Sequence, residues 1–147
     1  MSLEEKLMSH EGFKLKKYPD SKCVMTIYVG HKCLPGEVYA GTKEDALKYL
    51  RKDIAIAKKD LAIMFPDYKN FSQNRQGALI EVLFNMGRTT ITHSFPHFVH
   101  AVNTKQWNAA GDELQYADGR TKKALSKWYK DVKSNRAEDI LERIRGG

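Results

Sequence analysis

The chain lacks any long hydrophobic run. No stretch approaches the roughly 20 consecutive apolar residues that a bilayer-spanning helix needs, so the sequence predicts no transmembrane segment. The first residues, Met1–Lys6, are typical of the start of an amphipathic helix and lack the apolar core of a secretory signal peptide. We therefore expect a protein that is made and held in a cytoplasm.

Cysteine is also scarce. Cys23 and Cys33 are the only two cysteines, and no Cys/His cluster gives them a zinc-binding pattern. In a chain without a signal peptide, thiols stay reduced, so we expect both to be free. His93, His97 and His100 lie close together in sequence, but no carboxylate completes a metal-binding set. The sequence therefore predicts no metal site and no cofactor.

Acidic residues are fewer than basic ones. The chain has 25 Lys and Arg against 18 Asp and Glu, which gives a formal net charge of +7. Such a charge attracts polyanions. However, the basic residues alternate with acids, as in Lys43-Glu44-Asp45, and no arginine-rich tail is present. We therefore interpret them as solvated helix faces and predict no specific nucleic-acid partner.

The N-terminal residues carry a clear helix signal. Ser2-Leu3-Glu4-Glu5 is a capping box, in which the serine and the second glutamate satisfy each other's backbone N–H groups. Leu3, Leu7 and Glu11 follow at intervals of four and share one stripe of the helix. Gly12 can adopt the left-handed conformation that ends a helix. The sequence therefore predicts a helix that ends at Glu11.

The rest of the chain predicts an α+β fold. Its 147 residues suffice for one compact domain. Residues 13–40 are rich in β-branched and turn residues, which favours two or three short antiparallel strands. Six helices are expected after the strands. The first is a long helix from the Thr42 cap to about Phe65, and the second runs from the Ser72 cap to Gly87. Ser94 caps the third, whose first turn tolerates Pro96, Thr104 caps the fourth, and the last two cover about 121–132 and 135–144.

Three polar residues near the N-terminus could carry chemistry together. Glu11 lies at a helix C-terminus beside an apolar stripe, and both the helix dipole and burial favour its protonated form, which a general acid requires. Asp20 lies in a turn, and Thr26 opens a β-branched run. Taken singly, they are a surface glutamate, a turn former and a strand residue. Taken together, they offer a proton donor and a held water, which hydrolysis of a glycosidic bond needs.

The segment Glu11–Asp20, followed by Thr26–His31, resembles the N-terminal signature of the phage-type lysozymes. These are the T-even and lambdoid endolysins of glycoside hydrolase family 24. The resemblance continues in Arg75–Ile80, Phe84–Gly87, Trp107–Ala110, Lys127–Tyr129 and Asn135–Glu138. It implies one lysozyme-like domain over residues 1–147. The small β-containing lobe would be residues 1–42, the connecting helix 43–65 and the helical lobe 66–147, with the cleft between the lobes.

The resemblance also implies an activity. It is that of a muramidase, which hydrolyses the β-1,4 bond between N-acetylmuramic acid and N-acetylglucosamine in bacterial peptidoglycan. At the matching positions Glu11 is the proton donor, and Asp20 with Thr26 holds the attacking water. The T-even members invert the anomer, which implies carboxyl groups roughly 6.5–9.5 Å apart. The protein would act as a monomeric endolysin, held in the host cytoplasm until its release to the periplasm or cell wall.

Further positions match residues that support the site in this family. Gly30 and Phe84 match substrate-binding positions. Arg136 matches an arginine that pairs with the catalytic glutamate. Such a pair would favour the ionised form of Glu11 and so oppose the dipole and burial.

His31 and Asp53 match a family pair that forms a salt bridge between the small lobe and the connecting helix, and we interpret His31 as structural. The chain also departs from the family pattern. The family usually has glycine where this chain has Tyr28, and the segment between Lys32 and Thr42 is shorter than in the T-even members. A tyrosine there could fill space, stack on a sugar or reshape the cleft.

Two other functions compete with this one. A lytic transglycosylase needs one acid and no positioned water, so the presence of Asp20 and Thr26 beside Glu11 argues against it. A non-catalytic cationic protein that binds cell walls would use the net charge alone. The presence of both carboxylates favours the enzyme.

Overall fold

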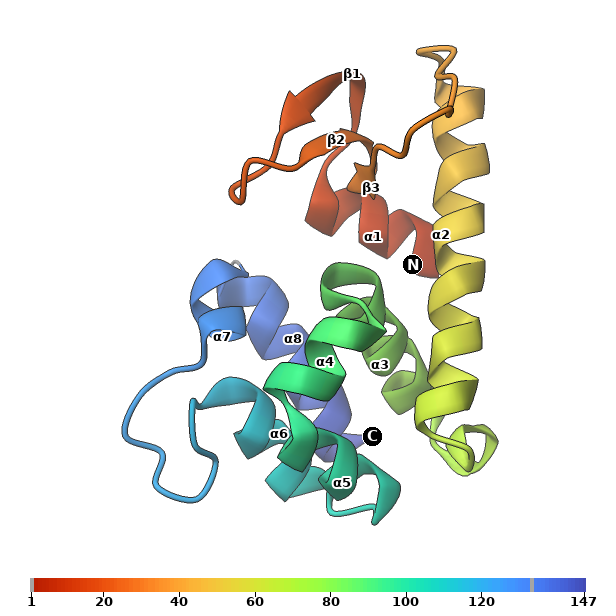
Figure 1. Cartoon of the computed structure of the whole chain (residues 1–147). Helices are drawn as coiled ribbons and strands as arrows, with labels where there is room; N and C mark the ends of the chain where they lie inside the picture. Colours follow the sequence, from red (N-terminus) through yellow and green to blue (C-terminus); the bar gives the residue numbers. More distant parts are fainter. Residues whose placement is uncertain (1, 133) are drawn as a thin grey trace. The chain divides into compact units, whose positions relative to one another are not determined.

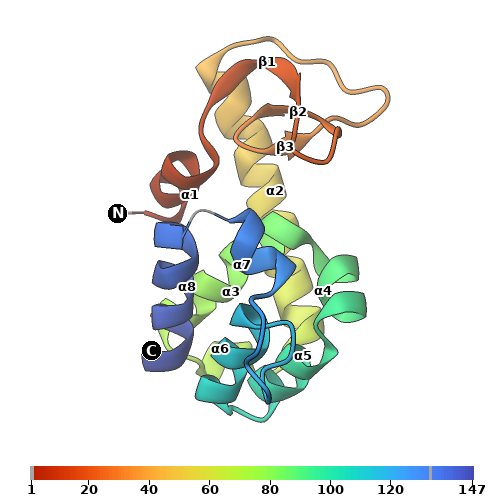
Figure 2. The ribbon, with the colours of Figure 1, turned by 90° about the vertical axis from the view of Figure 1, so that its left-hand side faces the viewer.

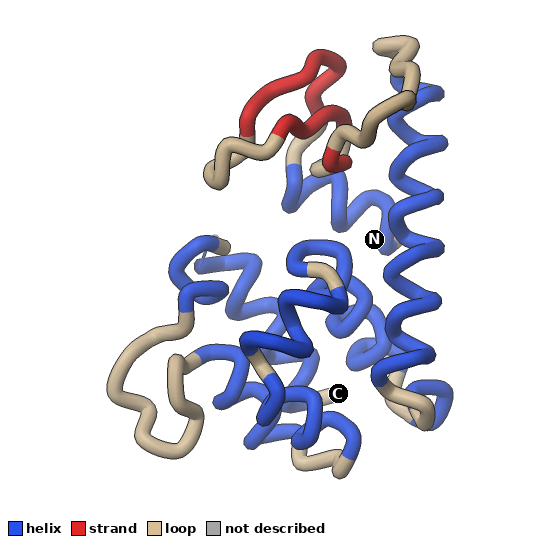
Figure 3. The backbone as a smooth tube through the Cα atoms, in the orientation of Figure 1, coloured by secondary structure: helices blue, strands red, loops and turns tan. Residues whose placement is uncertain are grey.

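The computed structural model describes residues 2–132 and 134–147, so Met1 and Lys133 lie outside the described residues. The fold is α+β, with helices and one small antiparallel sheet (Figure 3). The chain divides into two compact units, residues 1–56 and 57–147, and each is described by itself. Among the described residues, no helix has the length and apolar character needed to cross a membrane.

The first helix, α1 (Leu3–Glu11), has the predicted capping box. The Ser2 hydroxyl accepts the Glu5 N–H at 3.1 Å, and the Glu5 carboxylate accepts the Ser2 N–H at 3.2 Å. Leu7 is fully buried, as the apolar stripe predicts. The helix ends where Gly12 takes a positive φ of 80°. These contacts confirm the expected helix and leave Glu11 as its last residue.

The sheet of the first unit has the order β1-β2-β3, and both pairings are antiparallel. Its strands are β1 (Lys14–Pro19), β2 (Met25–Tyr28) and β3 (His31–Lys32) (Figure 1). The register places Tyr18 opposite Thr26. The predicted strands are therefore confirmed, and the turn before β2 and the turn after it lie at the two ends of this four-residue strand.

The long helix α2 (Lys43–Met64) begins at the predicted cap, because the Thr42 hydroxyl accepts the Asp45 N–H at 3.2 Å. The helix ends two residues before Pro66, which has no N–H to continue it. Figure 1 shows it as one unbroken helix, drawn in yellow. Its early residues Ala46 and Tyr49 pack with Ile27 and Tyr28 in the core of the first unit.

The second unit is built from helices. They are the short 3₁₀ helix η1 (Tyr68–Asn70), then α3 (Gln73–Met86), α4 (Arg88–Ser94), α5 (Pro96–Asn103), α6 (Trp107–Gln115), α7 (Lys127–Asp131) and α8 (Ser134–Gly146). Helix α8 packs against both α3 and α6 (Figure 2). The Ser72 cap and the Gly87 stop of α3 are confirmed, since the Ser72 hydroxyl accepts the Arg75 N–H at 3.2 Å.

Three expected helix starts are wrong. Ser94 ends a short unpredicted helix, α4, and α5 begins at Pro96 without a side-chain cap. Thr104 follows the end of α5 and donates its hydroxyl to the His100 carbonyl at 2.9 Å, so it does not cap α6. The helix expected over 121–132 begins only at Lys127, because the Ser126 hydroxyl accepts the Tyr129 N–H at 3.1 Å.

Candidate active site

Glu11 lies against the turn between β2 and β3. Gly30 in that turn has a φ of +66°, and a Cβ atom built there would lie 3.2 Å from the Glu11 Oε2 atom. Both the conformation and the short distance favour glycine, which has no Cβ. Gly30 therefore lets the turn approach the carboxyl group at the end of α1.

Asp20 lies in the turn between β1 and β2, and its carboxylate is held by the backbone. Its Oδ1 atom accepts the Lys22 N–H at 2.8 Å and the Val24 N–H at 2.9 Å. The Val24 N–H lowers the pKa of Asp20 most, the Lys22 N–H and the Lys32 ammonium lower it further, and partial burial opposes them. Asp20 is therefore a carboxylate at neutral pH, and the predicted turn is confirmed.

Thr26 and Asp20 are both hydrogen-bonded to the backbone of Val24. Its side chain is almost fully buried, with 3% of the residue exposed. Its hydroxyl donates to the Val24 carbonyl at 2.9 Å, while the Val24 N–H donates to Asp20. Both polar side chains are thus fixed by bonds to the same residue, which holds them in the same part of the hairpin.

Tyr18 lies near both carboxyl groups. It faces Thr26 across the strand pair, and the Lys14 Nζ atom lies 4.2 Å from the centre of its ring. Burial raises the pKa of the Tyr18 hydroxyl, and the negative charges of Glu11 and Asp20 raise it further. Tyr18 is not among the residues predicted from the sequence, because neither its type nor its spacing marks it.

Six of the predicted site residues lie in the first unit: Glu11, Asp20, Thr26, Gly30, His31 and Asp53. Gly30 borders Glu11, and Val24 bonds to both Asp20 and Thr26. Phe84 lies on α3 and is half-buried, and Arg136 lies on α8 with 6% of its surface exposed. Both belong to the second unit. Their approach to the sugar and to Glu11 stays a prediction.

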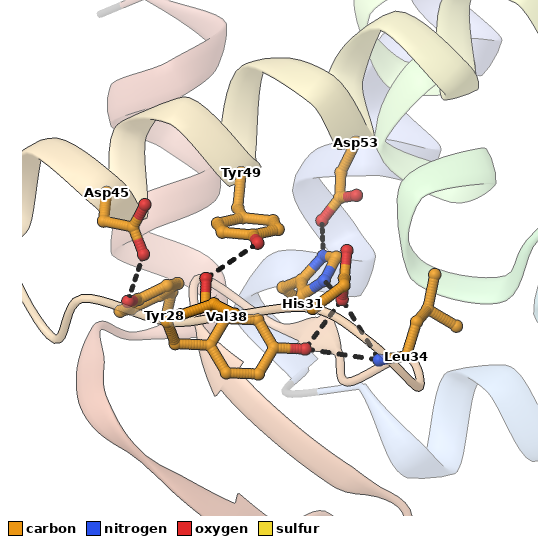
Figure 4. A network of polar contacts seen from close by, with 9 residues as sticks. Tyr28, His31, Leu34, Val38, Asp45, Tyr49 and Asp53 are labelled. Atoms are coloured by element: carbon orange, nitrogen blue, oxygen red, sulfur yellow. Dashed lines mark hydrogen bonds and ion pairs between the residues drawn. The ribbon is translucent and has the colours of Figure 1, made fainter.

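His31 is held by two carboxylates. Its Nδ1 atom lies 2.7 Å from Asp53 Oδ2, the contact that the resemblance implies, and its Nε2 atom lies 2.8 Å from Glu37 Oε1. Glu37 also accepts the Tyr39 hydroxyl at 2.7 Å and the Leu34 N–H at 3.1 Å. Figure 4 shows this network beside the start of α2. Glu37 is not among the site residues predicted from the sequence.

The network sets the charges of its members. Burial acts to lower the pKa of His31, but its bonds to Glu37 and Asp53 outweigh burial and raise it. Burial likewise acts to raise the pKa of Glu37, but its bonds to His31, Tyr39 and the Leu34 N–H lower it to about 2. In weakly acidic solution the imidazolium therefore faces an ionised Glu37.

His31→Asn is expected to lower the free energy of unfolding by about 3 kcal/mol near pH 5.5, because removing one member of a buried charge network leaves its partners uncompensated. Stabilisation by protonated His31 is complete below its unfolded pKa of about 6.5 and is lost as the pH rises through the raised folded value. Stabilisation by Glu37 is present above 4.5 and is lost as the pH falls through about 2.

The effect of His31→Asn should therefore be largest between about pH 4.5 and 6.5 and smaller at about pH 9. Urea unfolding of both proteins at pH 5.5 and pH 9 measures the difference. A difference that increases toward pH 9 would contradict the assigned charge states. Tyr49→Phe is a suitable control, because its hydroxyl bonds to the Val38 carbonyl at 3.1 Å, outside the His31 network.

Glycoside hydrolases use a pair of carboxyl groups, and the first unit offers Glu11 at the end of α1 and Asp20 in the turn between β1 and β2. Sequence comparison identifies the family. Residues 8–136 match the family described as Phage lysozyme, and the chain belongs to it. It is therefore a lysozyme, a glycoside hydrolase of the kind that degrades cell walls.

Two relatives illustrate the range of this family. One is described as probable T4-type lysozyme 2 of Dictyostelium discoideum. It is 26% identical over 146 residues, and the match covers 82% of this chain and 85% of the relative. The other is the endolysin of Salmonella phage P22, which is 30% identical over 112 residues, covering 73% of this chain and 74% of the relative.

Proposed function

We propose that this lysozyme is a muramidase that hydrolyses the β-1,4 bond between N-acetylmuramic acid and N-acetylglucosamine in bacterial peptidoglycan. Glu11 is the general acid, and Asp20 with Thr26 holds the nucleophilic water. The observation that carries this proposal is the placement of the two carboxyl groups, since Glu11 borders the β2–β3 turn at Gly30 and the β1–β2 turn holds Asp20 through the Lys22 and Val24 N–H groups. Membership of the Phage lysozyme family supports the substrate class.

The proposed reaction is a single displacement. Glu11 gives its proton to the glycosidic oxygen as the bond from that oxygen to the sugar C1 breaks. A water molecule attacks C1 from the opposite face, and Asp20 takes up the proton that this water loses. The lowered pKa of Asp20 supports this division, because the base must be ionised when the water attacks. The product has the inverted anomeric configuration.

The proposed setting is host lysis by an endolysin. The net charge of +7 favours association with the anionic polymers of a bacterial wall. The relative from phage P22 is itself described as an endolysin. The protein would act as a monomer after it leaves the host cytoplasm for the periplasm or cell wall.

Digestion of purified peptidoglycan tests the reaction class. We expect mass spectrometry to find muramic acid ends to which one water has been added, and early NMR spectra to show the inverted anomer. A 1,6-anhydro product would identify a lytic transglycosylase and overturn the hydrolase. The retained anomer would overturn the single displacement, because it requires a covalent intermediate.

A further inference from the structure

Tyr28 has an unusual backbone conformation beside the site. Its φ is +59°, in the left-handed region that glycine adopts freely and that large side chains rarely adopt. Yet the residue is fully buried, with 0% of its surface exposed. This burial excludes a role in stacking on a sugar. The cost of the conformation indicates that the surrounding contacts hold the side chain in place.

The hydroxyl of Tyr28 bonds to the segment that begins α2. It donates to Asp45 Oδ2 at 2.6 Å and accepts the Gly41 N–H at 2.9 Å. The same Asp45 oxygen accepts the Ala40 N–H at 2.9 Å, and the Asp45 N–H is bonded to the Thr42 cap. Asp45 is therefore fixed from two sides. Figure 4 shows the Tyr28 hydroxyl directed at this carboxylate.

Two other tyrosines enclose the ring of Tyr28. The Tyr39 ring meets it edge-on, with centroids 6.0 Å apart and an angle of 86°. The Tyr49 ring lies at 5.9 Å and is tilted by 34°. Aromatic pairs with these separations attract one another. These two ring contacts and the two hydrogen bonds hold the Tyr28 side chain in one position. We call the Tyr28 side chain with these four contacts the Tyr28 anchor.

The Tyr28 anchor lies directly before the turn that borders Glu11. Tyr28 is the last residue of β2, Gly30 lies in the turn that follows, and both have positive φ values. Gly30 is the residue whose added Cβ would lie 3.2 Å from Glu11 Oε2. A displacement at Tyr28 would therefore move the backbone that borders the carboxyl group. Catalytic groups lose rate steeply when they shift, and about 1 Å can cost 10²-fold.

We propose that Tyr28 is a positioning residue for the general acid: its bonds to Asp45 and Gly41 hold the Tyr28–Gly30 turn against the Glu11 carboxyl group. This inference rests on the proposed role of Glu11. Tyr28 itself touches no sugar, because it is buried, so we expect its loss to affect the chemical step more than substrate binding, in which Gly30 of the same turn is predicted to take part.

Tyr28→Phe tests the proposal, because it keeps the ring packing and removes both hydrogen bonds. We expect kcat on peptidoglycan fragments to fall about tenfold and KM to change less than twofold. Asp45→Ala removes the acceptor and should lower kcat by a similar factor. The double variant should be no slower than either single variant, because both changes release the same anchor.

Tyr39→Phe and Tyr49→Phe are matched controls. They remove hydroxyls from the same cluster of rings, but these hydroxyls bond to Glu37 and to the Val38 carbonyl. We expect both controls to melt slightly earlier than the unaltered protein and to keep kcat within twofold. A Tyr28→Phe variant with unchanged kcat would overturn the proposal. So would controls that lose as much kcat as Tyr28→Phe, because the effect would then be one of general stability.

The outcomes separate this inference from the proposed function. If Glu11→Gln is inactive while Tyr28→Phe has full kcat, the general acid stands and the positioning role is wrong. If Glu11→Gln stays active, the proposed acid is wrong, and the positioning role fails with it. Should Tyr28→Phe fail to fold, the kcat of Asp45→Ala decides the question by itself.

Discussion

Glu11→Gln is expected to lower kcat for peptidoglycan hydrolysis by about 10³-fold, within the usual contribution of general acid catalysis. Glutamine has nearly the same shape as glutamate but carries no proton that it can give to a leaving oxygen. The glycosidic oxygen would then depart as an unprotonated alkoxide, which is a poor leaving group. Initial rates of reducing-end release from purified peptidoglycan measure the loss, and thermal melting checks that the fold is kept.

Glu4→Gln is the matched control for Glu11→Gln. Glu4 lies on the same helix, α1, and its carboxylate pairs with Arg51 at 3.3 Å at the surface. Because surface ion pairs contribute little, Glu4→Gln should have unaltered activity and nearly unaltered stability. If the Glu11→Gln variant still reduced the turbidity of permeabilised bacteria, the killing would depend on the charge of the protein and not on catalysis. That result would favour the non-catalytic cationic protein.

Asp20→Asn is expected to lower kcat by about 10²-fold with little change in melting temperature. The asparagine Oδ1 atom can still accept the Lys22 and Val24 N–H groups, so the turn keeps its hydrogen bonds. The carboxylate that takes up the proton of the attacking water is lost. Stopped assays at several pH values, with thermal melts of the same samples, measure both effects.

The control for Asp20→Asn is Lys22→Ala. It alters the same turn but keeps the backbone N–H that Asp20 accepts. Its kcat should stay close to that of the unaltered protein. A large fall in the melting temperature of Asp20→Asn would contradict the prediction and make Asp20 a residue of the turn alone.

Much of the fold could be predicted because short-range signals coincide with packing. The capping box at Ser2, the caps at Thr42 and Ser72 and the stops at Gly12 and Gly87 all form where the sequence places them. Each of these signals depends on residues within one helical turn, and their neighbours in the fold do not oppose them. The ends of α1, α2 and α3 therefore follow from the sequence.

Other features depend on partners more than one helical turn away in the sequence. The segment before α7 has helix-forming residues, but its backbone pairs with the end of α6 instead. The Ala117 N–H donates to the Ala124 carbonyl at 2.9 Å, and the Ser126 N–H donates to the Gln115 carbonyl at 2.8 Å. Tertiary pairing of this kind overrides helix propensity, and no local sequence pattern predicts it.

The candidate site divides in the same way. Asp20 has a local turn signature and Glu11 a helix-end signature, and the resemblance supplied the catalytic roles of Glu11, Asp20 and Thr26. Tyr18 and Glu37 were missed because their importance comes from contacts made across the sheet and with His31. Neither residue stands out by type or spacing.

The positive φ of Tyr28 makes this residue dependent on its partners. A side chain at a φ of +59° costs about 1–2 kcal/mol compared with glycine, and the bond to Asp45 offsets part of that cost. Moving Tyr28 alone into a homologue without that carboxylate should destabilise the recipient, which makes the two positions epistatic.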